Sequence, residues 1–213
     1  MNALVDPVLV LVLMLNFLLL GTSRLRTAIH ASASQGALLG VLTIFVHGQI
    51  APRPALVAIA AMAIKGIVIP QLLQRALRDA AIKKEIEPYV SFLASLILGA
   101  AATGLAIVFA DRLPLAPEHQ GSLLVPASLA TVLCGFLILT TRRKAITQVV
   151  GYLTLENGIF VMGLTLHEAM PFFVEVGVLL DLLVAVFVIG IVIYHINREF
   201  ASLDVARLDT LKE

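Results

Sequence analysis

The amino-acid sequence predicts an all-α, polytopic membrane protein with seven transmembrane helices. Of its 213 residues, 60% are hydrophobic and only 14% are charged, and the mean hydropathy is +1.00. Soluble domains carry about 25% charged residues. Seven apolar runs, without strand-like alternation, reach the ~20 residues that a helix needs to cross a bilayer. They lie at 3–22, 28–48, 54–75, 89–110, 122–141, 146–167 and 172–196.

The basic residues predict how these helices are oriented. Two basic residues, Arg53 and Arg112, lie in the connections on one side. On the other side, twelve Lys and Arg residues follow the first, third, fifth and seventh runs. The positive-inside rule then places the N-terminus outside and the C-terminus in the cytoplasm. We expect the first run to be a retained helix, because no positively charged region precedes it. The twelve are Arg24, Arg26, Arg75, Arg78, Lys83, Lys84, Arg142, Arg143, Lys144, Arg198, Arg207 and Lys212.

Several classes of site are not expected in this chain. The one cysteine, Cys134, cannot form an intrachain disulfide, and no Cys/His spacing is typical of a metal or iron–sulfur site. No Gly-rich phosphate loop or nucleophile elbow is present. With a net charge of +1, the chain has no bias toward nucleic acid. We therefore expect no catalytic, cofactor-binding or metal-binding residue, and no activity of the chain alone.

Three ionisable residues fall near the middle of apolar runs: Lys65, Glu156 and Asp181. A charge at that depth costs roughly 2.5–3.5 kcal/mol on insertion scales and is usually functional or paired. Pro70 cannot donate to the carbonyl of Gly66, so we expect the helix to kink beside Lys65. These residues are candidates for a proton path, and structural ion pairs between helices are the alternative.

Four further polar residues are possible members of this path: His30, Asn157, Glu175 and His195. His195 follows Asp181 by fourteen residues, which places both on one helix face about 21 Å apart. The first half of the run 28–48 is polar, and it serves either as a hydrated entry route or for hydrogen bonds between helices. Gly151 and Gly158 predict close approach of another helix to the run 146–167.

The last 70 or so residues resemble a known family. Arg142-Arg143-Lys144, Gly151, Glu156-Asn157 and an acid in the next run are similar to the three-helix K subunit of complex I and the C subunit of multisubunit sodium/proton antiporters. With four helices in front, and with the phrase from Gly151 to Gly158, the chain resembles the hydrogenase 4 component E family. The resemblance divides the chain into a four-helix part, 1–121, and a three-helix part with a short cytoplasmic tail, 122–213.

The resemblance implies a membrane subunit of formate hydrogenlyase or a related nickel–iron hydrogenase. Glu156 and Asp181 would match the two intramembrane acids of the K subunit, with Asp in place of the second Glu. The implied partners are antiporter-like membrane subunits, soluble hydrogenase subunits that carry the nickel–iron and iron–sulfur centres, and lipid. The implied place is the cytoplasmic (inner) membrane of a bacterium or archaeon. A component of a cation/proton antiporter and a purely structural subunit are the alternatives.

Overall fold

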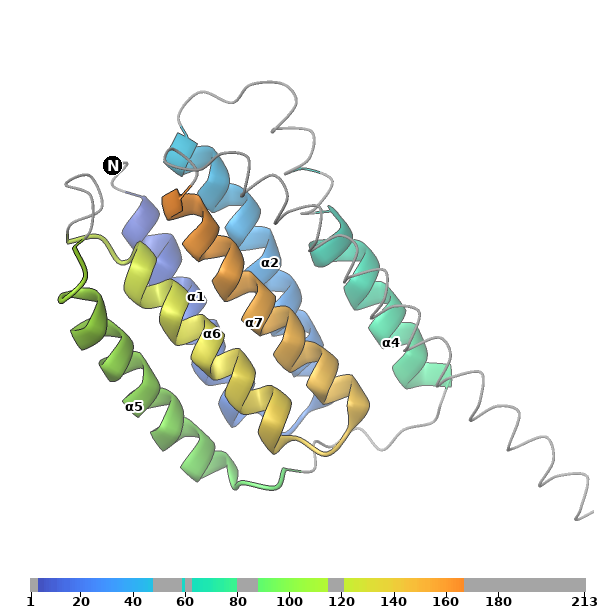
Figure 1. Ribbon diagram of the computed structural model, residues 1–213. Helices are drawn as coiled ribbons and strands as arrows, with labels where there is room; N and C mark the ends of the chain where they lie inside the picture. Colours follow the sequence, from blue (N-terminus) through green and yellow to red (C-terminus); the bar gives the residue numbers. More distant parts are fainter. Residues whose placement is uncertain (1–3, 48–58, 60–62, 80–87, 115–120, 167–213) are drawn as a thin grey trace, which may run out of the picture.

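The computed structural model describes residues 4–47, 59, 63–79, 88–114 and 121–166. Within these residues the chain is helical and contains no strand, which confirms the all-α prediction for this part (Figure 1). The elements are α1 (Val5–Gly21), α2 (Leu25–His47), the π-helix η1 (Ile64–Val68), α4 (Ile69–Asp79), α5 (Phe92–Ala110), α6 (Leu124–Thr141) and α7 (Ala145–Leu166).

Each of the first six predicted runs overlaps a helix of the structure, and the seventh, 172–196, lies outside the described residues. Among the described helices, α5 and α6 are long and apolar enough to cross a membrane, and α1 is apolar but shorter. This supports a membrane location. The seven crossings, the orientation of the termini and the division at residue 121 stay predictions.

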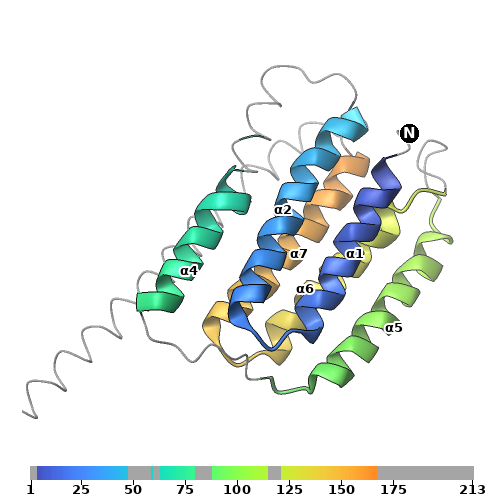
Figure 2. The same cartoon turned by 180° about the vertical axis from the view of Figure 1, so that it is seen from behind.

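Helices α1, α2, α6 and α7 form the centre of the fold. Figure 1 shows α6 and α7 in front of α1 and α2, and Figure 2 shows the same helices from behind. Helix α5 lies beside α1 and α6, and α4 lies on the other side, beside α2. The four central helices bury two apolar clusters. One, near the end where α1 is followed by α2, includes Leu20, Ile29, Ile138 and Val150, and the other, near the opposite end, includes Leu9, Leu42, Leu124 and Val161.

Glycines allow α6 and α7 to pack backbone against backbone. A Cβ placed on Gly158 would lie 2.6 Å from the nitrogen of Val132, and one on Gly151 would lie 2.6 Å from the nitrogen of Leu139. Real Cβ atoms do not approach this closely, so only glycine fits at both positions. The close approach predicted for these two glycines is therefore confirmed, and α7 is held at a fixed height and rotation on α6.

At one end of the bundle, α1 and α6 finish close to the starts of α2, α5 and α7, and we call this the basic end. Five basic residues lie there: Arg24, Arg26, Arg142, Arg143 and Lys144. The nitrogen of Tyr89 donates to the carbonyl of Thr141 at 2.8 Å, which joins the segment before α5 to the end of α6. At the opposite end, the nitrogen of Leu123 donates to the Asp6 carboxylate at 3.2 Å. That carboxylate lies where the positive end of the α6 dipole favours an anion.

Arg142 differs from the other residues of the basic end, because it is 1% exposed. Its Nη2 donates to the carbonyl of Leu20 at 2.7 Å, and its Nη1 donates to the carbonyl of Val90 at 3.4 Å. The guanidinium also lies 5.0 Å from the centre of the Phe92 ring. We predicted a loop charge at this position, and the structure shows a buried cation that joins the end of α1 to the segment before α5.

Candidate functional site

The two charged candidates that fall in the described part form an ion pair. The Lys65 ammonium on η1 lies 3.0 Å from a carboxylate oxygen of Glu156 on α7, and the two side chains are 13% and 2% exposed. The sequence left open whether Glu156 or Asp181 faces Lys65. The structure pairs Lys65 with Glu156, and Asp181 lies outside the described residues.

Lys65 lies in a turn of π-helix. The N–H of Ile69 donates to the carbonyl of Ile64, five residues back rather than four. Pro70 follows this turn and has no N–H for the carbonyl of Gly66, which removes one α-helical hydrogen bond at this place. The sequence predicted a distortion beside the lysine, and the structure has it at the lysine itself. Turns of π-helix inside helices are frequent at functional sites.

Small residues of α2 make room for this turn. A Cβ on Gly36 would lie 3.4 Å from the Cβ of Lys65, and one on Gly66 would lie 3.9 Å from the Cβ of Ala37. The chain of η1 therefore lies directly against α2, and the lysine side chain reaches past it to α7. Its ammonium lies 5.7 Å from the centre of the Phe160 ring, one turn after Glu156, which adds a cation–π contact to the ion pair.

A chain of polar side chains crosses the bundle beside this pair, and we call it the polar layer. It comprises Asn157 on α7, Gln35 on α2, Asn16 on α1 and Thr131 on α6, all buried. Asn157 donates to Gln35 at 3.2 Å, Gln35 donates to Asn16 at 2.8 Å, and Asn16 donates to Thr131 at 2.8 Å. The Thr131 hydroxyl then donates to the carbonyl of Ala127 at 2.7 Å.

The last bond fixes the direction of the whole chain. A backbone carbonyl only accepts, so the Thr131 hydroxyl donates to it and accepts from the amide nitrogen of Asn16. The oxygen of Asn16 must then accept from Gln35, and the oxygen of Gln35 from Asn157. The orientation of each amide follows from its neighbour.

The polar layer separates the two apolar clusters on all four central helices. On α1, Asn16 lies between Val12 of one cluster and Leu19 of the other, and on α2, Gln35 lies between Ala31 and Leu39. Thr131 divides α6, and Glu156 with Asn157 divides α7, in the same way. The ion pair and the polar layer therefore form one polar level inside an apolar bundle.

His30 is not brought to this level. It is exposed on α2, and its Nε2 lies 3.3 Å from the amide nitrogen of Gln74 on α4. Gly36, which contacts Lys65, follows His30 by six residues, or about 9 Å along the helix. His30 therefore lies between the ion pair and the basic end. Glu175 and His195, the other possible members of the path, lie outside the described residues.

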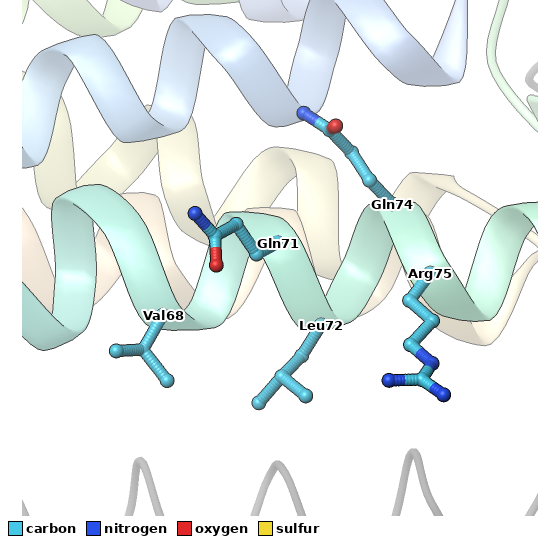
Figure 3. A pocket seen from close by; sticks show the side chains of 5 residues that line it. All are labelled: Val68, Gln71, Leu72, Gln74 and Arg75. Carbon is cyan, nitrogen blue, oxygen red and sulfur yellow. The ribbon is translucent and has the colours of Figure 1, made fainter.

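A pocket of about 310 Å³ lies along α4, lined by Val68, Gln71, Leu72, Gln74 and Arg75. Figure 3 shows Val68, Leu72 and Arg75 on one side of α4, whereas Gln74 extends toward α2. The contact between Gln74 and His30 joins α4 to α2.

Sequence reasoning missed part of this site. Asn16 and Thr131 were not singled out, and Gln35 was given a role only as one of two alternatives for the polar half of its run. The structure supports hydrogen bonding between helices for Gln35. One signal was available: Asn16 is the first uncharged polar side chain after Pro7 in an otherwise apolar run. Burial of an unpaired amide is costly, so such a residue predicts a partner on another helix.

Comparisons with known proteins give one relative over nearly the whole chain. The uncharacterized protein Rv0085 of Mycobacterium tuberculosis is 36% identical over 194 residues, which is 89% of this chain and 87% of that protein. Hydrogenase-4 component E of Escherichia coli K12 and that of Shigella flexneri are each 33% identical over 101 residues, 47% of this chain and 46% of theirs. No family model and no solved structure matches the chain.

The two kinds of match support different statements. The similarity to hydrogenase-4 component E covers about half of each protein, and it supports the resemblance of the sequence to this family in part. The similarity to the mycobacterial protein extends over almost the full length of both chains. The chain therefore belongs to the same family as the uncharacterized protein Rv0085 of Mycobacterium tuberculosis.

Proposed function

We propose that this chain is a non-catalytic membrane subunit of a nickel–iron hydrogenase or a related complex I-like assembly, and that it contributes a proton path. The observation that carries the proposal is the ion pair between the buried Glu156 and the 13% exposed Lys65, 3.0 Å apart in a level of polar side chains. Charged residues inside membrane helices are rare and are typical of proton relays. The partial similarity to hydrogenase-4 component E supports the class of complex.

The pair can carry a proton because its two members can exchange one. Transfer from the Lys65 ammonium to the Glu156 carboxylate leaves an amine and a carboxylic acid, both neutral. In a buried site the cost of desolvating two charges reduces the advantage of the ionised pair over this neutral one. The acid then releases its proton to the next acceptor, for which we propose Asp181, and the amine takes a proton from the other side.

The basic end indicates the side from which protons enter. Among the described residues, Arg24, Arg26, Arg142, Arg143 and Lys144 lie at this end, and Arg112 lies at the other. By the positive-inside rule, we propose that the basic end faces the cytoplasm. His30 lies on the same side of the pair, where an imidazole could take protons from water and pass them toward Lys65.

Helix α5 supplies the surface that a membrane subunit requires. Its large apolar side chains remain exposed, among them Leu93, Ile97 and Leu105 at 70%, 61% and 65%. An apolar face of this kind is unusual on a soluble monomer and is typical of contact with lipid or with another membrane subunit. We propose that lipid and antiporter-like subunits cover it in the assembly.

Replacement of Glu156 by Gln tests the proton path. We expect Glu156→Gln to leave the complex assembled and to reduce proton uptake, driven by electron transfer in inverted membrane vesicles, by at least about tenfold, because the amide cannot accept the proton. Asp111→Asn is the matched control. It makes the same chemical change at an exposed position at the end of α5, and we expect it to pump like the parent.

The same preparation distinguishes the proposal from its alternatives. Nickel and iron–sulfur subunits that co-purify in mild detergent would support the hydrogenase assembly. Antiporter-like subunits without them would support a cation/proton antiporter. Undiminished pumping by an assembled Glu156→Gln complex would leave the ion pair a purely structural role.

A further inference from the structure

Two adjacent residues of α2 lie between the helices that supply the ion pair. A Cβ built on Gly36 would lie 3.4 Å from the Cβ of Lys65, so η1 packs against α2 at this position. Gln35 accepts a hydrogen bond from Asn157, the residue next to Glu156 on α7, at 3.2 Å. One turn of α2 is therefore the common support of η1 on one side and α7 on the other.

We propose that Gln35 is the positioning residue of this site: its hydrogen bond to Asn157 fixes the rotation of α7 on α2 and thereby holds the Glu156 carboxylate against Lys65. The importance of this role for proton movement rests on the proposed function. The role itself is a property of the folded chain and can be measured without any partner subunit.

Gln35 is suited to this role because each of its polar atoms is engaged. Its Nε2 donates to Asn16 at 2.8 Å and to the carbonyl of Val12 at 3.4 Å, both on α1, and its Oε1 accepts from Asn157. The fixed direction of the hydrogen bonds in the polar layer prevents the Gln35 amide from flipping. A flipped amide would place its nitrogen against the amide nitrogen of Asn157 and its oxygen against the amide oxygen of Asn16. α7 is therefore tied through Gln35 to α1, and rotation of α7 would break a bond in a fully buried layer.

The chemistry of the layer excludes a role for Gln35 as a proton carrier. The polar layer consists of three amides and one hydroxyl, none of which takes up or releases a proton near neutral pH. It therefore holds the carboxylate without competing with it for protons. On the other side of α2, a Cβ built on Gly36 would lie 3.4 Å from the Cβ of Lys65, so η1 packs against this turn of α2 at ordinary van der Waals distance.

The experiment measures whether Lys65 and Glu156 still act as a pair when Gln35 is removed. Lys65→Met and Glu156→Gln are made singly and together, in the parent, in Gln35→Leu and in Thr131→Val, and thermal unfolding of the purified full chain is followed in detergent. In the parent we expect the double variant to lose less than the sum of the single losses, by several degrees, because a lone buried charge is costlier than none. In Gln35→Leu we expect the two losses to add.

Thr131→Val is the matched control, since it breaks the same polar layer at its far end. It leaves the bond from Asn157 to Gln35 in place, so we expect the coupling of the parent to remain. Unchanged coupling in Gln35→Leu would overturn the positioning role. Loss of coupling in both backgrounds would also overturn it, because any damage to the layer would then suffice.

A second pair of variants serves if Gln35→Leu does not fold. Gln35→Asn shortens the side chain by one methylene, and Asn157→Gln lengthens its partner by the same amount. We expect the coupling to fall in Gln35→Asn and to return in the double variant, which restores the reach between α2 and α7. Failure to return would overturn the proposal.

The outcomes for positioning and for proton movement are separable. Coupling that depends on Gln35, together with normal pumping by Glu156→Gln, would refute the proton path and leave the positioning role standing. If pumping requires Glu156 but the coupling between Lys65 and Glu156 does not depend on Gln35, only the positioning role is refuted.

Discussion

In the described part of the chain, Lys65 and Arg142 are cations with little exposure, 13% and 1%, and they have different kinds of partner. Lys65 meets a carboxylate, whereas Arg142 donates hydrogen bonds to the carbonyls of Leu20 and Val90. Carbonyl dipoles stabilise a cation without themselves taking up a proton, and the Leu20 carbonyl belongs to the last turn of α1, where the helix dipole favours positive charge. Arg142 is therefore a fixed charge of structural use, and Lys65 is the cation with a partner that can exchange a proton.

Arg142 provides the prediction at the residue scale. We expect Arg142→Met to lower the free energy of unfolding by about 2–4 kcal/mol, because two buried carbonyls lose a charged donor. Thermal or denaturant unfolding in detergent would measure the loss. Arg143→Met is the control: Arg143 is exposed and stacks on Tyr89 at 4.5 Å, a contact worth under about 1 kcal/mol. Equal losses in the two variants would contradict a special role for Arg142.

Arg142 also illustrates a pKa shift that has no consequence near neutral pH. Burial lowers the pKa of its guanidinium below the ordinary value. The unfolded chain therefore holds this proton more tightly, and stability would rise with pH only near that pKa, because the folded state then loses the proton first. Arginine titrates far above neutral pH. We expect the difference between the parent and Arg142→Met to be constant between about pH 6 and 9.

The sequence predicted the residues of the ion pair but not their surroundings, and the reason is physical. A charge in an apolar run is conspicuous because its insertion is costly, so Lys65 and Glu156 were identified as candidates. Thr131 is not conspicuous, because a threonine can satisfy its hydroxyl on its own helix, as the bond from Thr131 to Ala127 does. Burial of Arg142 depends on two distant segments that meet only in the fold.

At the scale of elements, α6 and α7 form the most closely packed pair among the described helices, because glycines let their backbones approach. A Cβ on Gly158 would meet the nitrogen of Val132 at 2.6 Å and the carbonyl oxygen of Ser128 at 2.8 Å. These are backbone atoms, which cannot turn away as a side chain can. Gly151 and Gly158 of α7 were visible in the sequence as sites of close approach, whereas Gly135 of α6, which faces Leu155, became significant only when the two helices were seen together.

Gly158→Ala is the prediction at this scale. We expect it to destabilise the fold by about 1–3 kcal/mol, because the helices must separate to admit a methyl group. Gly163→Ala, on the same helix with nothing within 4 Å of the added Cβ, is the control. It should be neutral or stabilising by up to about 1 kcal/mol, since alanine favours helix more than glycine. A neutral Gly158→Ala in unfolding measurements would show that α6 and α7 can shift.

At the scale of the whole molecule, the charges and the polar level define a direction. Most of the described basic residues gather at one end, and Asp6, Asp111 and Arg112 lie at the other. The polar level with its ion pair lies between the two apolar clusters, away from both ends. The alternation of basic loops along the sequence predicted this distribution, because successive antiparallel helices return every second connection to the same end.

This distribution predicts which end faces the cytoplasm. In a Cys134→Ala background, a single cysteine is placed in the basic end as Ser23→Cys or at the opposite end as Asp111→Cys, both at exposed positions. We expect a membrane-impermeant maleimide to label Asp111→Cys in intact spheroplasts and Ser23→Cys only in inverted vesicles, because basic loops are retained in the cytoplasm. Labelling of both positions in spheroplasts would show that the two ends are not separated by a membrane. The reverse labelling pattern would show that the molecule has the opposite orientation in the membrane, with His30 on the outer side of the ion pair.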